Sequence, residues 1–244
     1  MIQFEKWQGL GNHFIIVDAL EDPTAVPALC DPRTGIGADG LIIASADPPT
    51  MKIYNADGSV AAMCGNGLRC AARYLAERSV DLSGGIHTDS GLMKLRGVGA
   101  EVTVEVGRPR ITGEGQHGAH RFIAVDIGNP HAVFIDPDAS FDLPTIGSQM
   151  QHHGDFPDGV NAHLVVTGQS PVSVTPFERG VGLTQACGTG AAASAFALAT
   201  AHELPWPIAT ELPGGRLVFE PGEGGVLWMT GPASRVFRGE MSPD

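Results

Sequence analysis

Cys64-Gly65-Asn66-Gly67 stands directly before a helix-forming run rich in alanine and leucine, and the pattern returns at Cys187-Gly188-Thr189-Gly190. Almost half of the 244 residues separate the two cysteines. A second pair of segments, Gly11-Asn12-His13-Phe14 and Gly128-Asn129-Pro130-His131, has nearly the same separation, and each precedes an apolar, strand-like run. Two unrelated markers with a matching offset indicate that one lobe is used twice.

The segments around the two cysteine helices predict an α+β fold with two pseudo-symmetric lobes. Runs of β-branched or alternating apolar residues, separated by glycine, follow or precede each helix, a pattern typical of strands. We therefore expect each lobe to be a mostly antiparallel curled sheet around a central helix. The polar, glycine-rich segment 112–118 predicts the boundary. This division gives an N-terminal lobe 1–113 and a C-terminal lobe 114–232, with the active site in the cleft between them.

Composition excludes several classes of protein. A net charge of −12 and the absence of lysine or arginine runs exclude a basic nucleic-acid-binding surface. Four cysteines are too few for a disulfide scaffold and indicate a reducing compartment. The N-terminus lacks the apolar core of a signal peptide. The uncharged run 180–201 is too polar for a membrane span and instead predicts a buried helix. We expect a cytoplasmic protein without nucleic-acid or membrane partners.

A cysteine at the start of a helix lies in a distinctive electrostatic environment. The N–H groups of the first turn have no partner within the helix, and the helix dipole adds positive potential there, so anions are stabilised. A dipole contribution of about 2 kcal/mol would lower a thiol pKa by roughly 1.5 units from about 8.5. We therefore expect both thiols to titrate near neutrality. Glycines on either side of each turn would let a ligand carboxylate reach the bare amides.

If two such helix starts face each other, their two cysteines could together invert a stereocentre of a substrate that lies between them. One thiolate can remove an α-proton while the opposing thiol protonates the other face. The converging amides would stabilise the carbanion through its carboxylate, as an oxyanion hole does. The alternative for an isolated cysteine is a small buried hydrophobe. The matched pair disfavours that alternative for Cys64 and Cys187, whereas Cys30 and Cys70 have no partner motif.

No cofactor or metal site is evident in the sequence. Pyridoxal phosphate would need a Schiff-base lysine, and none of Lys6, Lys52 and Lys94 lies in a recognisable site. The histidine pairs with plausible ligand spacing lie far in sequence from the cysteines. We therefore expect no cofactor and no metal, and interpret these histidines as solvated loop residues.

Motifs over nearly the whole chain resemble the diaminopimelate epimerase family. They occur in family order at 9–14, 55–59, 63–70, 128–131, 160–161 and 178–191. The resemblance implies cofactor-independent epimerisation of LL-2,6-diaminopimelate to the meso form, in lysine and peptidoglycan precursor biosynthesis. It also implies that the C-terminal strand, within 233–244, returns to the first lobe.

The resemblance further implies roles for individual residues. Cys64 and Cys187 would form the acid/base pair, while His131 and Glu178 would bind or orient the reacting amino group. The remaining substrate contacts would come from Asn12, Asn55, Gly65, Asn66, Asn129, Asn161, Arg179, Gly188 and Thr189. Two positions depart from the family pattern. His13 stands where the family more often has aspartate, and Gly40 stands where some members have a substrate-contacting glutamine.

Three alternatives remain open from the sequence. The nearest is a racemase or epimerase of another amino acid on the same fold. Arg179 argues against it, because a guanidinium matches the distal carboxylate that a smaller substrate lacks. A cysteine-dependent hydrolase or transferase with His131 as base would need only one of the two thiols, and a non-catalytic binding protein would keep only the pocket. The expected partner is a small-molecule amino-acid substrate, and a homodimer is left open.

Overall fold

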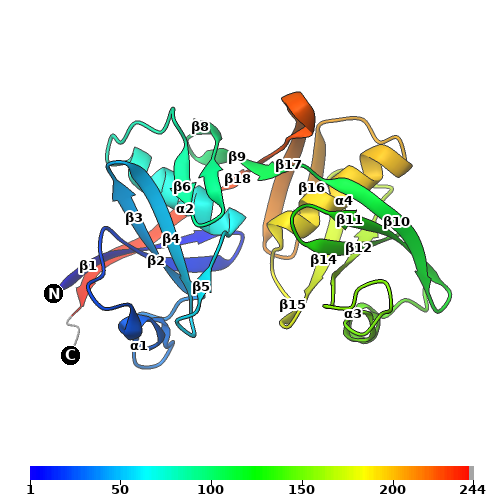
Figure 1. The fold of residues 1–244 in the computed structure, drawn as a ribbon, viewed down its shortest axis with the longest axis horizontal. Helices are drawn as coiled ribbons and strands as arrows, with labels where there is room; N and C mark the ends of the chain where they lie inside the picture. Colours follow the sequence, from blue (N-terminus) through cyan, green and yellow to red (C-terminus); the bar gives the residue numbers. More distant parts are fainter. Residues whose placement is uncertain (242–244) are drawn as a thin grey trace. The chain divides into compact units, whose positions relative to one another are not determined.

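The computed structural model describes residues 1–241 and has a two-lobed α+β fold, which confirms the predicted fold class (Figure 1). Contacts divide the chain into two compact units. The first contains Met1–Glu105 together with residues 231–241, and the second contains Val106–Thr230. Within 1–241, every helix falls short of the length and hydropathy that a membrane span requires.

The first unit is built around one mixed sheet and the helix α2. Its sheet has the strand order β19-β1-β2-β3-β4-β6-β7, with β5 paired to β4. The elements are β1 (Ile2–Gly9), β2 (Asn12–Val17), η1 (Pro23–Ala25), α1 (Val26–Cys30), β3 (Gly40–Ala46), β4 (Pro49–Asn55), β5 (Val60–Ala61), α2 (Gly65–Ala76), β6 (Ile86–Thr88), β7 (Gly91–Met93), β8 (Leu95–Val98), β9 (Glu101–Gly107) and β19 (Ser234–Met241).

The second unit has the corresponding arrangement around α4. Its strands follow the order β10-β11-β12-β13-β14-β16-β17-β18, with β15 paired to β14. The elements are β10 (Arg110–His117), β11 (His120–Asp126), β12 (Pro130–Ile135), α3 (Leu143–Met150), β13 (Asn161–Val166), β14 (Val172–Glu178), β15 (Gly182–Leu183), α4 (Gly188–Ala201), β16 (Ile208–Leu212), β17 (Gly215–Pro221), η2 (Glu223–Gly225) and β18 (Leu227–Pro232).

The internal repeat is visible in the strand pairing. In the first unit, β1–β2, β3–β4 and β6–β7 are antiparallel, whereas β2–β3 and β4–β6 are parallel. In the second unit, β11–β12, β13–β14 and β16–β17 are antiparallel, whereas β12–β13 and β14–β16 are parallel. The same succession of pairings therefore occurs twice, and each time a two-residue strand pairs with the fourth strand of the series.

Each central helix packs against several strands of its own sheet. The helix α2 contacts β1, β2, β3 and β4, and α4 contacts β11, β12, β13, β14, β16 and β17 (Figure 1). Most residues of α4 are buried, including the alanines at 191–193, 195 and 197. The uncharged run 180–201 thus contains a buried helix, as the sequence predicts. Small side chains are needed there because strands surround the helix on several sides.

The segment 112–118, where the sequence predicts the boundary between the lobes, is mostly a strand. It lies mostly in β10, an edge strand that pairs antiparallel with β11 along its length. Gly115 pairs with Phe122 of β11, and glycine is required there because a Cβ would lie 2.3 Å from Cζ of Phe122. Backbone hydrogen bonds hold β10 in place, so the strand does not need the apolar alternation that identifies strands in a sequence.

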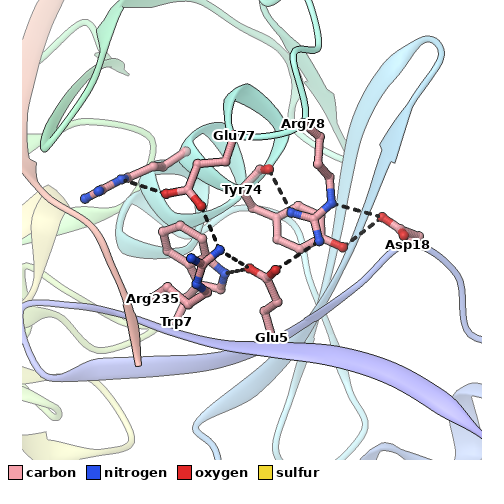
Figure 2. Close-up of polar contacts among 8 residues, drawn as sticks. Glu5, Trp7, Asp18, Tyr74, Glu77, Arg78 and Arg235 are labelled. Atoms are coloured by element: carbon pink, nitrogen blue, oxygen red, sulfur yellow. Dashed lines mark hydrogen bonds and ion pairs between the residues drawn. The ribbon is translucent and has the colours of Figure 1, made fainter. Parts of the chain in front are cut away.

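Polar side chains at the C-terminal end of α2 hold the C-terminal strand against the first unit. Arg235 at the start of β19 bonds Glu77 at 2.8 Å, and Arg73 donates to the carbonyl oxygen of Ala233. The buried carboxylate of Glu5 lies at the centre of this network (Figure 2). It accepts hydrogen bonds from Trp7 Nε1 at 2.9 Å and Arg78 Nη2 at 3.1 Å. Burial of charge is tolerated here because several donors surround one carboxylate.

Replacing Glu5 with glutamine should lower the free energy of unfolding by about 2 kcal/mol at pH 7, because Arg78 and Arg235 would lose their shared carboxylate. Burial raises the pKa of Glu5, but the Trp7 hydrogen bond and the two arginines outweigh it and lower the pKa below 4.5. The carboxylate therefore stabilises the fold above pH about 4.5. The difference between wild type and E5Q should shrink as the pH falls below that value.

Urea unfolding at pH 7 and at pH 4 measures both effects. The matched control is E114Q, which removes an ion pair to Arg121 of 2.8 Å whose side chains are 60% and 78% exposed. That variant should change the free energy of unfolding by less than about 0.5 kcal/mol. Equal destabilisation by E5Q and E114Q would contradict a central role for Glu5.

Candidate functional site

The first predicted cysteine caps the start of α2. Cys64 has extended backbone angles, φ −145° and ψ 119°, and its Sγ accepts a hydrogen bond from the Gly67 amide at 3.5 Å. Gly67 packs tightly on the sheet, because a Cβ there would lie 3.1 Å from Cδ1 of Ile42. The half-buried sulfur of Cys64 therefore lies beside first-turn amides, where negative charge is stabilised.

A chain of polar contacts links Cys64 to Asp39. The Cys64 thiol donates to Oδ1 of Asn12 at 3.8 Å, and Nδ2 of Asn12 donates to Oδ2 of Asp39 at 2.8 Å. The same carboxylate oxygen accepts the backbone N–H of His13 at 2.9 Å. Asp39 thus fixes the Asn12 amide with Oδ1 toward the sulfur. The ring of His13, the first departure from the family pattern, lies 3.8 Å from that carboxylate.

Backbone crowding explains the second departure, at Gly40. A Cβ on Gly40 would lie 2.4 Å from the carbonyl oxygen of Tyr54, on the neighbouring strand. Any side chain here would push β3 and β4 apart. This backbone therefore does not accommodate the glutamine of some family members.

A fully buried guanidinium lies behind the first turn of α2. Arg69 donates to Oδ1 of Asn66 at 2.9 Å and to the carbonyl oxygens of Gly65 at 3.4 Å and Pro232 at 3.2 Å. Burial lowers the pKa of Arg69, while electrostatic interactions with Cys70 and Cys64 raise it. The counterpart of Arg69 at the start of α4 is Ala192. The two helix starts therefore differ by one buried positive charge.

Two predicted substrate-binding asparagines use their side chains inside the first unit. Asn66 is buried and its Oδ1 is taken by Arg69, which leaves the backbone of Gly65 and Asn66 to offer donors. Asn55 is exposed, and its Nδ2 donates to Oγ of Ser59 at 2.9 Å. The hydrogen bond to Ser59 therefore fixes the orientation of the exposed Asn55 amide and leaves its oxygen as an acceptor for a ligand.

The second predicted cysteine occupies the N-cap position of α4 but, unlike Cys64, makes no side-chain capping hydrogen bond. Cys187 has φ −124° and ψ 102°, and its Sγ lies 3.7 Å from Oγ1 of Thr189. The cysteine is 5% exposed and therefore more deeply buried than Cys64. Glu178, at the end of β14, accepts a hydrogen bond of 2.5 Å from the Thr184 hydroxyl.

The thiol of Cys187 does not titrate near neutrality, contrary to the expectation from the helix dipole. Burial and, to a smaller extent, the negative charge of Glu178 raise its pKa to about 12. Polar interactions with the Thr189 hydroxyl and the Gly190 amide act in the opposite direction but are weaker. The expectation was wrong for Cys187 because desolvation of a buried thiolate outweighs the potential of the helix start. Cys187 is therefore a protonated thiol at neutral pH.

His131 engages both of its ring nitrogens within the second unit. Its Nε2 lies 2.9 Å from Oδ1 of Asn129, and its Nδ1 lies 2.8 Å from Nε2 of His163. The ring is fully buried, and burial lowers the pKa of His131 to about 3. His131 is therefore neutral near pH 7. A direct contact with a substrate amino group would require one of these hydrogen bonds to break.

Asn161 and Arg179 also lie together in the second unit. The buried side chain of Asn161 donates to the carbonyl oxygen of Pro130 at 3.0 Å and accepts the backbone N–H of Arg179 at 3.1 Å. The exposed guanidinium of Arg179 donates through Nη1 to the carbonyl oxygen of Asp158 at 3.0 Å. Asn161 thus positions the chain at Arg179, whose other donors are available to a ligand.

The structure divides the predicted residues between the two units. The first contains Cys64, Gly65, Asn66, Asn12 and Asn55; the second contains Cys187, Gly188, Thr189, Glu178, Arg179, Asn129, His131 and Asn161. Sequence reasoning missed three residues that contact them, namely Asp39, Arg69 and His163. Two of these adjoin recognised motifs: Arg69 lies within 63–70, and His163 follows Asn161 by two residues. Within 1–241, no cluster of histidine, cysteine or acidic side chains has the geometry to hold a metal ion.

Solved structures with a similar fold are distant in sequence. A phenazine biosynthesis family protein from Enterococcus faecalis superposes with a TM-score of 0.75 at 11% identity, covering 99% of this chain and all of the other. A hydroxyproline epimerase from Agrobacterium vitis, solved with trans-4-hydroxy-L-proline, gives a TM-score of 0.67 at 14% identity, covering 98% and 90%. At such low identities the likeness shows the fold alone.

Relatives identified by sequence are much more similar to this chain than the solved structures above. The family profile for diaminopimelate epimerase matches residues 4–112 and 123–236. The diaminopimelate epimerase of Cyanothece sp. is 39% identical over 286 residues, covering 98% of this chain and 99% of its own. That of Zymomonas mobilis is 36% identical over 264 residues, covering 97% and 96%. Because these matches include both cysteine helices and nearly the full length of each relative, the chain belongs to the diaminopimelate epimerase family.

Proposed function

We propose that the chain epimerises LL-2,6-diaminopimelate to meso-diaminopimelate without a cofactor, with Cys64 and Cys187 as the acid/base pair. The observation that carries the proposal is the repeated helix start, in which each cysteine occupies the N-cap position of a helix that begins Gly-x-Gly. Relatives that match nearly the whole chain are named diaminopimelate epimerases. The reaction would serve lysine and peptidoglycan precursor biosynthesis.

The proton balance assigns a different starting role to each sulfur. A thiolate removes the α-proton, and the thiol on the opposite face of the α-carbon donates its own proton to the carbanion. One turnover therefore exchanges the protonation states of the two sulfurs and leaves their total charge unchanged. Because burial keeps Cys187 protonated, we assign Cys187 as the acid, and Cys64 becomes the base once its thiol loses the proton that it donates to Asn12 in the substrate-free structure. The buried charge of Arg69 supports this assignment.

The helix starts would bind the reacting end of the substrate. Backbone amides at 65–66 and 188–189 would donate to its carboxylate and stabilise the charge that develops there. Glu178 carries negative charge close enough to raise the pKa of Cys187, so it is well placed to attract the ammonium group on the reacting α-carbon. In this proposal His131 acts on substrate orientation through Asn129.

The polar residues around Arg179 would bind the distal end of the substrate. The exposed guanidinium suits the distal carboxylate because its fork makes two parallel hydrogen bonds. Asn161 would act by positioning Arg179, since its own amide is engaged by the protein. We propose side-chain contacts to the substrate for Asn12, Asn55 and Asn129.

We also propose that the protein is cytoplasmic and forms a homodimer. Four reduced cysteines suit a reducing compartment. The C-terminal strand β19 is the edge of its sheet, and its Val236 and Phe237 are 56% and 45% exposed. The unpaired backbone groups of an edge strand can pair with a second chain, and Val236 and Phe237 would supply apolar contacts between the charged residues of β19.

Wild-type protein incubated with LL-diaminopimelate in deuterium oxide should form meso product that carries one solvent deuterium at the inverted carbon. Replacing either Cys64 or Cys187 with alanine should lower inversion by at least about 10²-fold, because one proton-transfer partner is lost. Chiral chromatography with mass spectrometry measures both products and label.

The control variant is C30A, which removes a buried thiol of the first-unit core and should keep the inversion. Absence of inversion and exchange by reduced wild-type protein would contradict the proposed function. Equal turnover of a monocarboxylic amino acid such as proline, insensitive to R179A, would instead favour a racemase of another amino acid.

Alkylation should distinguish the two proposed catalytic thiols. At pH 8 a thiol with a pKa of about 12 is roughly 10⁻⁴ thiolate, so iodoacetamide should modify Cys64 at least about 100-fold faster than Cys187. Cys30 and Cys70 serve as internal controls, since burial raises their pKa values to about 11 and about 12. Peptide mass spectrometry gives the four rates. Faster modification of Cys187 would contradict its assignment as the resting acid.

If the protein is a homodimer, analytical ultracentrifugation at micromolar concentration should give the mass of two chains. Replacing exposed Val236 with aspartate should shift the mass toward one chain, because charge on an edge strand opposes pairing. The same change at exposed Val181, in the second unit, is the control. A wild-type mass of one chain would contradict the homodimer.

A further inference from the structure

Two buried histidines and an asparagine form a continuous hydrogen-bonded chain in the second unit. Nε2 of His163 lies 2.8 Å from Nδ1 of His131, and Nε2 of His131 lies 2.9 Å from Oδ1 of Asn129. Both rings are 0% exposed, and their centroids are 5.1 Å apart. Asn129 is only half-buried. The chain therefore runs from the interior of the unit to a side chain that solvent reaches.

The contacts fix where each proton lies. Because Oδ1 of Asn129 accepts, Nε2 of His131 carries a proton and Nδ1 of the neutral ring does not. Nδ1 of His131 must then accept from a protonated Nε2 of His163. The remaining Nδ1 of His163 is bare and has no hydrogen-bond partner among residues 1–241. Burial keeps both rings neutral, since it lowers the pKa of His131 to about 3 and that of His163 well below 6.5.

The surroundings of His163 favour this direction of the chain over the reverse. In the reverse direction Asn129 would donate, and Nδ1 of His163 would carry a buried proton without an acceptor. The His163 ring packs against Gly190 in the first turn of α4, where a Cβ would lie 2.1 Å from Cε1 and 2.8 Å from Nδ1. Positive potential at a helix start stabilises a bare lone pair and opposes an N–H. Orphaned buried N–H groups are also rare in proteins.

The corresponding positions of the first unit hold apolar residues, so packing alone does not require His131 and His163 in the second unit. Phe14 follows Gly11-Asn12-His13 as His131 follows Gly128-Asn129-Pro130. Ile42 packs against Gly67 at the start of α2, as His163 packs against Gly190 at the start of α4. Phenylalanine and isoleucine therefore occupy the corresponding positions in the same strand arrangement. The second unit has replaced two apolar side chains with a polar chain that ends at Asn129.

We propose that His163 is a positioning residue that acts through His131 to hold the Asn129 amide with Nδ2 directed to the substrate. This inference rests on the proposed function, in which Asn129 binds diaminopimelate. With Oδ1 held by His131, both protons of Nδ2 are available to a substrate carboxylate. The reverse orientation would present Oδ1 and repel the same carboxylate. The chain thus gives the amide one orientation before the substrate arrives, which removes an ordering cost from binding.

The first test reads the tautomers directly in the full chain. Protein with ¹⁵N-labelled histidine should show His131 and His163 as neutral rings with the proton on Nε2 and a bare Nδ1, at pH 7 and without substrate. Two-bond proton–nitrogen correlation spectra report these states, and loss of the corresponding signals in H131F and H163I assigns them. A proton on Nδ1 of His131 would overturn the proposal whatever the activity.

The second test separates positioning from packing by kinetics. His163→Ile copies the residue of the first unit, whereas His163→Gln keeps a donor for Nδ1 of His131. H163I should raise the KM for diaminopimelate about tenfold, the size expected for weakening one hydrogen bond to a charged group, with kcat changed less than about threefold. H163Q should restore KM to within about threefold of wild type. Thermal unfolding confirms that each variant is folded.

A double-mutant cycle with Asn129→Ala decides whether the effect passes through that amide. In the N129A background, adding H163I should leave KM and kcat unchanged, because no amide remains to be oriented. An equal further rise in KM would show an effect on general packing and overturn the proposal. Absence of turnover in wild type would refute the proposed function itself, whereas normal turnover with equal KM values in wild type and H163I would refute only the role of His163.

Discussion

The close approach of each central helix to its own sheet determines how the rest of the fold is arranged. At Gly67 a Cβ would lie 3.1 Å from Ile42, and at Gly190 it would lie 2.1 Å from His163. Only glycine lets the first helical turn lie this near a strand without displacing its side chain. The same bare backbone leaves first-turn amides uncovered beside the N-cap cysteine. One steric requirement thus creates both the packing and the anion-binding character of each helix start.

The two helix starts share this geometry but differ in their charge. Behind Cys64 lies the buried guanidinium of Arg69, which also bonds the carbonyl oxygen of Pro232 and so belongs to the contacts between α2 and the returning C-terminal chain. Near Cys187 lies the carboxylate of Glu178, and Ala192 replaces the arginine. A positive charge favours a thiolate and a negative charge favours a thiol. The charged groups near the two cysteines therefore differ in sign, and in the proposed two-base reaction this difference would give the two sulfurs different starting roles.

The sequence predicted those features that short motifs determine. Cys-Gly-x-Gly before an alanine-rich run identified both helices, because cap residue, glycines and helix formers are contiguous. Features that depend on burial or on strand register were missed. The predicted pKa of Cys187 was wrong because an argument from the helix dipole alone leaves out the desolvation of the buried thiolate. Asp39 and His163 contact site residues only through the pairing of β2 with β3 and of β12 with β13. The strand β10 was not recognised in the sequence because its glycines and polar residues show no apolar alternation.

A buried thiol with a pKa of about 12 is compatible with catalysis when its environment changes on substrate binding. The negative charge of Glu178 raises the pKa of Cys187 in the substrate-free protein. If Glu178 pairs with the substrate ammonium group, that group neutralises the carboxylate and adds positive charge beside the sulfur. Both effects lower the free energy of the thiolate that remains after Cys187 donates its proton. The substrate would then supply the electrostatic change that makes the acid competent, while the empty protein keeps the same sulfur protonated and unreactive.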